Sequence, residues 1–164
     1  MERIWAPWRQ SYVSNAKTDE SCIFCPDHKG KDDRARLILS RSDHSLIMLN
    51  RYPYTGGHLM AAPLRHIAGL EELSDAELLD LMHMVIRGRE LLMRVAKPDG
   101  FNVGINLGKA AGAGVEEHLH IHIVPRWNGD SNFMTVVGDL RVIPDGLTVA
   151  YERLAAALDA EDAT

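Results

Sequence analysis

The sequence predicts an α+β fold, with a mostly antiparallel sheet of about five strands, one long helix and a C-terminal helix. Two observations support this prediction. Short apolar runs bounded by Gly, Pro and polar clusters lie on both sides of one long helical pattern, and the chain of 164 residues can bury a core without disulfide bonds. We expect an N-terminal arm over 1–20, a main domain over 21–135, and an extension with a helix over 136–164.

The strands are predicted from apolar runs that end at turn-forming residues. The first two runs are separated by a polar stretch, which favours a hairpin, and a Pro with two consecutive glycines marks the turn that follows. A last helix is expected over 145–160. The expected strands cover 37–39, 45–49, 58–63, 101–107 and 118–124.

Segment 75–97 has the pattern of a long amphipathic helix. Ser74 is a favourable N-cap, Glu77 stands where a capping box requires it, and Pro98 ends the segment. Gly88 costs the helix ~1 kcal/mol relative to Ala, which favours a close packing contact at that position. The predicted apolar face consists of Leu78, Leu81, Met82, Val85, Leu92 and Val95.

Three histidines, His118, His120 and His122, recur at a spacing of two and alternate with aliphatic residues. A strand points successive side chains to opposite faces, so the imidazoles would line one face and the aliphatic side chains the other. Imidazole is a general base, a nucleophile or a metal ligand near neutral pH. The pattern alone permits three interpretations: three ligands of one metal, one nucleophile with two helpers, or a polar face turned to solvent.

The two cysteines stand in one Cys-x-x-Cys pair, Cys22 and Cys25. In a reducing compartment such a pair is metal-binding or redox-active, and the redox interpretation needs a βαβ context that the sequence does not offer. As a metal site, the pair supplies two of the four ligands of a zinc ion.

Loop 108–114, just before the histidines, is rich in glycine and exposes backbone N–H groups that suit an anion such as phosphate.

Charge and hydropathy exclude several kinds of partner. The net charge of −5 argues against nucleic acid, although it permits a nucleotide. No apolar run approaches the ~20 residues of a membrane span, and the N-terminus lacks the apolar stretch of a signal peptide. We therefore expect no nucleic-acid or membrane partner and a cytoplasmic location.

Several separated motifs resemble the histidine triad (HIT) superfamily. Its hallmark, three histidines alternating with hydrophobic residues, matches 118–124. The resemblance covers about 20–135 and is specific, because further motifs agree with the family in order and spacing. They are the Cys-Ile-Phe-Cys run at 22–25, Asn50, Gly57 with His58, the Pro-Leu-Arg-His run at 63–66, Asn106, and Pro125 with Arg126.

The resemblance implies a nucleotidyl transferase or hydrolase that acts through a covalent nucleotidyl-histidine. His120 would be the nucleophile, His122 would donate to phosphate oxygens, and His58 would support the triad from the adjacent strand. Asn50 would hydrogen-bond the ribose. Four further residues are expected on the substrate side: Asn106, Gly112, Gly114 and Trp127.

The resemblance also implies a structural zinc ion and a homodimer. The zinc ligands would be Cys22, Cys25, His66 and His118, a saturated tetrahedral set that leaves no open position for catalysis. His120 and His122 would then remain metal-free, in contrast to a tri-histidine metal hydrolase.

Two segments, 5–9 and 126–133, are similar to the branch that contains diadenosine tetraphosphate phosphorylases. We therefore expect a nucleotide or dinucleoside polyphosphate substrate, with a leaning toward phosphorolysis. The alternatives are a purine nucleoside phosphoramidate hydrolase and, in another class, a nucleotide-binding sensing module with little turnover. The phosphoramidase branch has Ser where this chain has Val115, which disfavours the first alternative.

Overall fold

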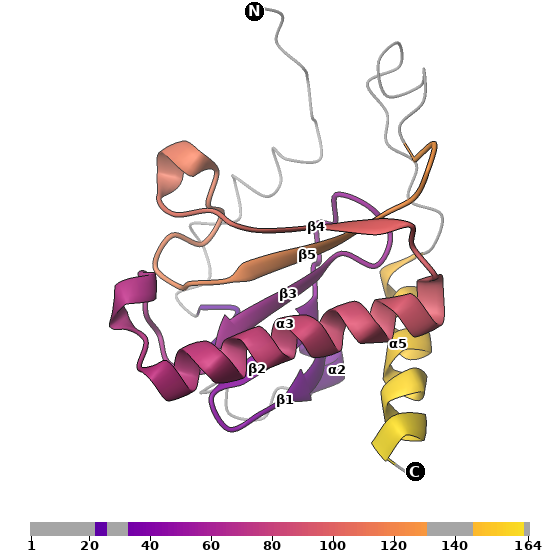
Figure 1. The fold of residues 1–164 in the computed structure, drawn as a ribbon, viewed down its shortest axis with the longest axis horizontal. Helices are drawn as coiled ribbons and strands as arrows, with labels where there is room; N and C mark the ends of the chain where they lie inside the picture. Colours follow the sequence, from indigo (N-terminus) through magenta and orange to yellow (C-terminus); the bar gives the residue numbers. More distant parts are fainter. Residues whose placement is uncertain (1–21, 26–32, 131–145, 163–164) are drawn as a thin grey trace, which may run out of the picture.

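The computed structural model describes residues 22–25, 33–130 and 146–162. The predicted arm over 1–20 and the expected domain boundaries at 20/21 and 135/136 lie outside these residues. The described part has the predicted α+β fold, a single sheet with helices packed against it (Figure 1).

Five strands form the sheet, and every neighbouring pair is antiparallel. The strand order is β1-β2-β3-β5-β4, so β1 and β4 are the two edges. The strands are β1 Ile38–Arg41, β2 Ser45–Leu49, β3 Leu59–Pro63, β4 Gly100–Ile105 and β5 Ile121–Arg126.

The predicted strand 118–124 is wrong at its start, because β5 begins only at Ile121. The backbone N–H of Leu119 donates to the carbonyl of Ile67, 2.6 Å away in the loop after β3. The first two histidines are therefore held by a loop contact and not by the sheet ladder.

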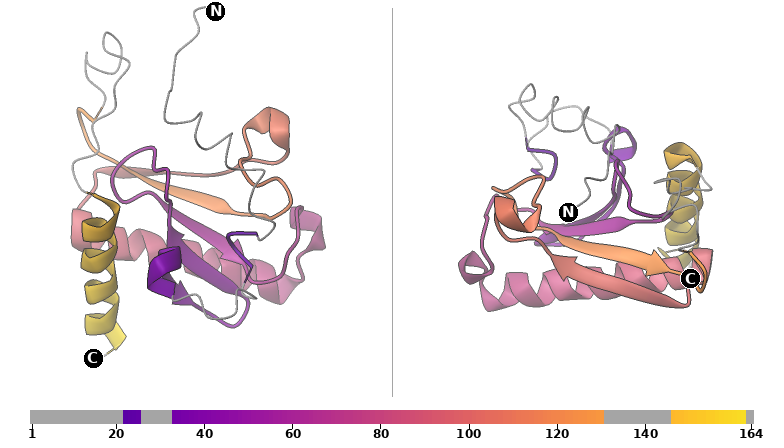
Figure 2. Two further views of the ribbon diagram at one scale, coloured as in Figure 1. Left: turned by 180° about the vertical axis from the view of Figure 1, so that it is seen from behind. Right: turned by 90° about the horizontal axis from the view of Figure 1, so that it is seen from above.

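Two long helices cover the sheet on the side away from the histidines. Helix α3, Asp75–Ala96, runs along this face (Figures 1 and 2). It begins at the predicted capping box of Ser74 and Glu77. Helix α5, Leu147–Asp162, packs against α3 and β1. Three short helices are not predicted by the sequence patterns: α2 Asp33–Arg36, η1 Leu70–Glu72 and η2 Lys109–Ala111.

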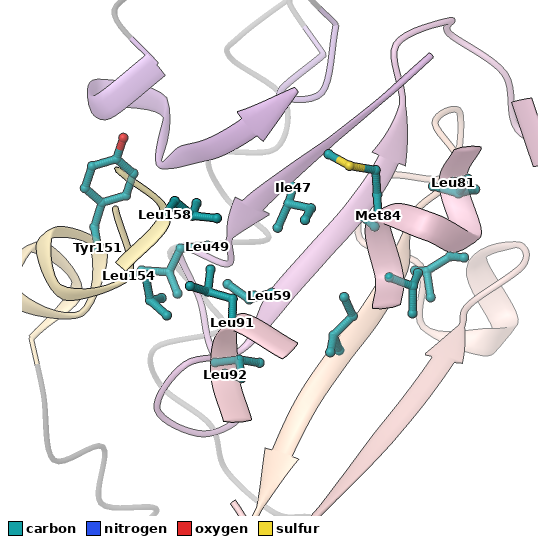
Figure 3. Packing of buried hydrophobic residues seen from close by; sticks show 14 of the residues in the cluster. Ile47, Leu49, Leu59, Leu81, Met84, Leu91, Leu92, Tyr151, Leu154 and Leu158 are labelled. Atoms are coloured by element: carbon teal, nitrogen blue, oxygen red, sulfur yellow. The ribbon is translucent and has the colours of Figure 1, made fainter. Parts of the chain in front are cut away.

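The main hydrophobic core lies between the sheet, α3 and α5 (Figure 3). Gly88 of α3 faces the sheet, and a Cβ at this position would stand 3.0 Å from Cδ1 of Ile123. The predicted close contact at Gly88 is thus confirmed. From α5, the hydroxyl of Tyr151 donates to the carbonyl of Ile38 at 2.9 Å, which fastens α5 to the edge of the sheet.

The predicted apolar face of α3 is partly wrong. Leu81, Val85 and Leu92 are buried and Val95 packs against the core, but Leu78 and Met82 are 43% and 42% exposed. The core covers the line through Leu81 and Gly88 and, on one side of it, Met84 and Leu91, so Leu78 and Met82 on the other side turn outward. The outward side of α3 carries exposed apolar residues at Leu79, Met82, Ile86 and Met93.

No helix in the described residues is long and apolar enough to cross a membrane.

Candidate active site and metal centre

The three triad histidines lie on the sheet face opposite α3. The intervening aliphatic residues Leu119, Ile121 and Ile123 belong to the core against α3, which confirms the predicted alternation. His118 and His120 are 0% and 5% exposed, so their rings are buried. The ring centroids of His120 and His122 lie 4.9 Å apart, with the planes at 79° to each other.

The hydrogen bonds of His58 define its tautomer and that of His122. The backbone N–H of Tyr54 donates to Nδ1 of His58 at 3.1 Å, and the amide nitrogen of Asn50 lies 3.3 Å from the same atom. In the neutral ring Nδ1 is then an acceptor, so Nε2 carries the hydrogen. His58 Nε2 donates to Nδ1 of His122 at 3.0 Å, which leaves the Nε2–H of His122 as a hydrogen-bond donor.

His120 has the opposite tautomer. Its Nδ1 lies 2.8 Å from the carbonyl oxygen of His118, and a carbonyl oxygen can only accept. Nδ1 therefore carries the hydrogen, and Nε2 of His120 has a free lone pair. The two neighbouring rings thus offer one nucleophilic nitrogen and one N–H donor, the pair of groups that a transfer of a phosphate-bearing group needs.

His118 points its Nδ1 away from this pair, toward the two cysteines. Its Nε2 donates to the carbonyl of Pro63 at 2.8 Å, which leaves the lone pair on Nδ1. Nδ1 lies 3.2 Å from Sγ of Cys22, 3.7 Å from Sγ of Cys25 and 3.2 Å from Nδ1 of His66. The potential ligand atoms of these four residues all lie within 4.8 Å of one another, so the structure brings together the predicted metal ligands.

The pKa values of the buried imidazoles are lowered, chiefly because burial disfavours the charged ring. Burial and the nearby His122 and His120 lower the pKa of His58 to about 3. Burial and His120 lower the pKa of His122 to about 4. The pKa of His120 is also lowered by burial, although its bond to the His118 carbonyl opposes the shift. These rings are therefore neutral at pH 7, as the tautomers described above require.

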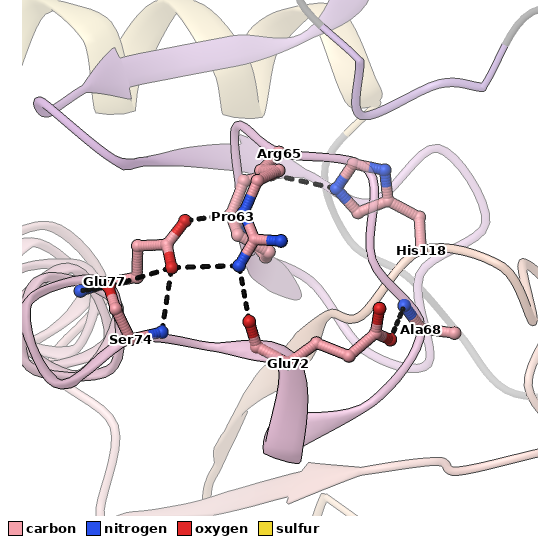
Figure 4. A network of polar contacts seen from close by, with 7 residues as sticks. All are labelled: Pro63, Arg65, Ala68, Glu72, Ser74, Glu77 and His118. Carbon is pink, nitrogen blue, oxygen red and sulfur yellow. Dashed lines mark hydrogen bonds and ion pairs between the residues drawn. The ribbon is translucent and has the colours of Figure 1, made fainter.

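A polar network holds the loop that carries His66 (Figure 4). Arg65, its neighbour, pairs with both carboxylate oxygens of Glu77 at 2.8 and 3.0 Å, and also donates to the carbonyl of Glu72. Glu77 in turn caps α3 through Ser74. The loop between β3 and α3 is thus fastened to the start of α3. This loop carries His66, a member of the metal-ligand cluster, which consists of the four potential ligands Cys22, Cys25, His66 and His118.

A groove of about 340 Å³ opens beside His122, and its walls include Tyr54, Asn102, Asn106 and Arg126. Gly104 also lines it, pairs with His122 across β4 and β5, and has no heavy atom within 4 Å of the place its Cβ would occupy. The predicted substrate-side residue Asn106 lines the same groove as the triad residue His122.

The other predicted substrate-side residues are placed differently. Asn50 lies next to His58, and its side-chain oxygen accepts from the backbone N–H of Tyr52 at 2.9 Å. Gly112 and Gly114 are exposed in the loop after η2. The indole of Trp127 donates to the carbonyl of Ala96 at 3.3 Å, which fastens it to the end of α3, and it does not line the groove.

Three residues at the site are not identified by sequence reasoning. Phe24 packs on the rings of His118 and His120, Tyr54 packs on His58 and His122, and the buried Arg36 donates to the carbonyls of Ile23 and Cys25. Phe24 stands inside the Cys-x-x-Cys motif, and that position is the signal that could have identified it.

Comparison with known proteins agrees with this geometry. The HIT domain family matches residues 32–129, and the chain belongs to that family. AP-4-A phosphorylase of Mycobacterium tuberculosis is 40% identical over 151 residues, which cover 88% of this chain and 77% of the relative. The asymmetrical bis(5'-nucleosyl)-tetraphosphatase of Schizosaccharomyces pombe is 32% identical over 93 residues, or 57% of this chain and 50% of the relative.

Solved structures share the fold. A zinc-bound histidine triad family protein from Mycobacterium smegmatis superimposes with a TM-score of 0.63 at 29% identity. The match covers 77% of this chain and 86% of the other.

Proposed function

We propose that this chain is a nucleotidyl transferase that cleaves diadenosine polyphosphates by phosphorolysis, through a covalent adenylyl group on His120. The observation that carries the proposal is the pair of opposite tautomers: a lone pair on Nε2 of His120 beside an N–H on Nε2 of His122. The 40% identity to AP-4-A phosphorylase supports the substrate class and the acceptor.

In the first step, Nε2 of His120 attacks the α-phosphorus of diadenosine tetraphosphate. A P–N bond forms, the bridging P–O bond breaks, and its electron pair leaves with ATP. The ring becomes cationic, and its Nδ1–H remains bonded to the His118 carbonyl, which stabilises that charge. The N–H of His122 donates to a non-bridging oxygen of the α-phosphate, with His58 holding the ring in orientation.

In the second step, an oxygen of inorganic phosphate attacks the same phosphorus. The P–N bond breaks, its electron pair returns to Nε2 of His120, and ADP leaves. If water attacks instead, the product is AMP and the enzyme is an asymmetrical hydrolase, the activity named for the relative from Schizosaccharomyces pombe.

Product analysis distinguishes these outcomes. We expect ADP and ATP from diadenosine tetraphosphate only when phosphate is present, and a nucleotidylated protein by intact-mass spectrometry when phosphate is omitted. The His120→Asn variant should bind the nucleotide without forming the adduct. AMP and ATP without phosphate would establish hydrolysis, and wild-type binding without turnover would favour a sensing module. Turnover of adenosine phosphoramidate alone would favour the phosphoramidate hydrolase.

We also propose that Cys22, Cys25, His66 and His118 hold a structural zinc ion. Zn–S and Zn–N bonds of about 2.3 and 2.0–2.1 Å give a tetrahedron with edges of roughly 3.3–3.8 Å. Four of the six donor–donor distances lie between 3.1 Å, for Cys25 and His66, and 3.7 Å, for Cys25 and His118, and all six are within 4.8 Å, which is close to that size. The bond from His118 to the Pro63 carbonyl is the outer contact typical of a zinc-bound histidine.

Elemental analysis and X-ray absorption test the zinc proposal. One zinc per chain with two sulfur and two nitrogen ligands is expected, and Cys25→Ser should lose it. His83, an exposed histidine on α3, supplies the control variant His83→Ala, which should keep the metal. A metal bound by all three triad histidines would overturn this ligand set and the nucleophile assignment together.

A homodimer and a cytoplasmic location complete the proposal. The exposed apolar side chains of α3 (Leu79, Met82, Ile86 and Met93) together with the edge strand β4 offer a surface that a second copy of the chain would cover. Light scattering should give a dimer mass, and Ile86→Glu should shift it to the monomer. A wild-type monomer at micromolar concentration would contradict the dimer. Thiols kept as metal ligands fit a reducing compartment.

A further inference from the structure

We propose that Phe24 is a positioning residue for His120, and that the metal-ligand cluster acts on the nucleophile through it. The inference rests on the proposed function in two points: it takes His120 as the nucleophile, and it takes the cluster of Cys22, Cys25, His66 and His118 as the zinc site. It assigns to the Cys-x-x-Cys turn a role in catalysis beyond holding a metal.

Phe24 is 0% exposed and stands between the two cysteines. Its ring lies 4.9 Å from the ring of His120 with the planes only 24° apart, which is a stacked contact. It also lies 5.1 Å from the ring of His118. The turn that would hold the metal therefore places one aromatic face against the ring of His120.

One hydrogen bond does not fix the ring of His120. The bond from Nδ1 to the His118 carbonyl holds one edge, but the ring can still tilt about that edge, since χ2 of histidine has a broad minimum. The lone pair of Nε2 lies in the ring plane, so a tilt turns it away from the phosphorus. A flat neighbour on the face of the ring prevents this tilt, and an aliphatic side chain of similar volume does so less well.

The turn itself is held from two sides. Sγ of Cys22 and Sγ of Cys25 face the His118 and His66 rings at 3.2 and 3.1 Å, where a bound metal would tie them. On the other side, the guanidinium of Arg36 donates to the carbonyls of Ile23 and Cys25, each at 2.8 Å. Loss of the metal releases the first constraint and leaves the second. The turn then stays in place but gains freedom, and Phe24 moves with it.

The test compares Phe24→Leu with Met48→Leu, a substitution in the same apolar cluster on β2. Both variants remain apolar and buried. We expect Phe24→Leu to lower the single-turnover rate of His120 nucleotidylation by about tenfold to a hundredfold, with the KM for diadenosine tetraphosphate within twofold of wild type. Met48→Leu should leave both values unchanged. Phe24→Tyr keeps the flat ring and should restore the rate even if the buried hydroxyl lowers stability.

The coupling to the metal is tested by removing zinc from both proteins. Chelation should lower the wild-type rate but change the Phe24→Leu rate by less than twofold, because the route through Phe24 is already lost. Equal loss in both proteins would overturn the coupling. Equal rates in Phe24→Leu and Met48→Leu would overturn the positioning role.

A spectroscopic measurement separates this inference from the proposed function. ¹³C relaxation spectra of the His120 ring in the zinc-loaded protein should show a rigid ring. In Phe24→Leu and in the zinc-free wild type they should show added motion of that ring, which the Nδ1 bond to the His118 carbonyl still holds along one edge. This result holds even if diadenosine tetraphosphate is not the substrate, and an unchanged spectrum in Phe24→Leu would overturn the inference while leaving the proposed function intact.

Discussion

Acidification should destabilise the protein through His58. The ring is 0% exposed, and burial together with the neighbouring histidines lowers its pKa to about 3, whereas an unfolded histidine has a pKa of about 6.5. Between these two pH values, His58 binds a proton in the unfolded chain but stays neutral in the folded chain. Stability is therefore unaffected by His58 above about pH 6.5 and is lost as the pH falls below it.

The size of the effect follows from proton linkage. A difference of one bound proton changes the free energy of unfolding by about 1.4 kcal/mol per pH unit. From pH 7 to pH 5 the unfolded imidazole passes from mostly neutral to almost fully protonated, while the folded one stays neutral. His58 alone should thus cost about 2 kcal/mol of stability over this interval.

Urea unfolding of wild type and His58→Gln at several pH values isolates this contribution. The amide of Gln can accept from the Tyr54 N–H and donate to His122, but it does not titrate. The other histidines contribute to both proteins and cancel in the difference. We expect the stability difference between the two proteins to change by about 2 kcal/mol from pH 7 to pH 5, to the disadvantage of wild type. Parallel curves would refute the reasoning, since they would mean that His58 takes up its proton in the folded state.

Three further predictions concern the core and the loop of the proposed metal centre. Gly88→Val should lower the free energy of unfolding, measured by urea denaturation, by about 2–3 kcal/mol, because even a Cβ at this position would stand 3.0 Å from Cδ1 of Ile123. Gly88→Ala should lower it less, because alanine favours a helix more than glycine does. Tyr151→Phe removes the bond to the Ile38 carbonyl and should cost about 1–2 kcal/mol in the same assay, with the nucleotidylation rate unchanged. Arg65→Ala frees the loop of His66 and should weaken zinc binding about tenfold in a chelator competition, whereas an unchanged affinity would mean that the loop holds without Arg65.

The features that the sequence predicted well depend on local patterns. The capping box at Ser74, the alternation of the triad, and the close approach at Gly88 each follow from spacing along one segment. The prediction that the cysteine pair, His66 and His118 form one site came from the family resemblance. The structure places these four side chains together, although they are separated by up to 96 residues in the sequence.

The features that the sequence did not predict depend on contacts between distant segments. The stacking of Phe24 on His120 and the bonds from Arg36 to the turn depend on where the Cys-x-x-Cys segment docks, which no periodicity encodes. The exposure of Leu78 and Met82 depends on how α3 is rotated on the sheet. An apolar stripe predicts that a helix is amphipathic, but not which of two adjacent apolar sides faces the core.

The space beside Gly104 allows the shape of the groove to be changed by substitution at this residue. A Cβ there would have no heavy atom within 4 Å, so the fold has room for a side chain on this wall of the groove beside His122. Replacing Gly104 by Ser, Val or Phe would narrow this space stepwise while leaving the tautomers of the triad in place. Variation at this one position offers a simple route by which related enzymes, natural or engineered, could come to prefer substrates of different bulk.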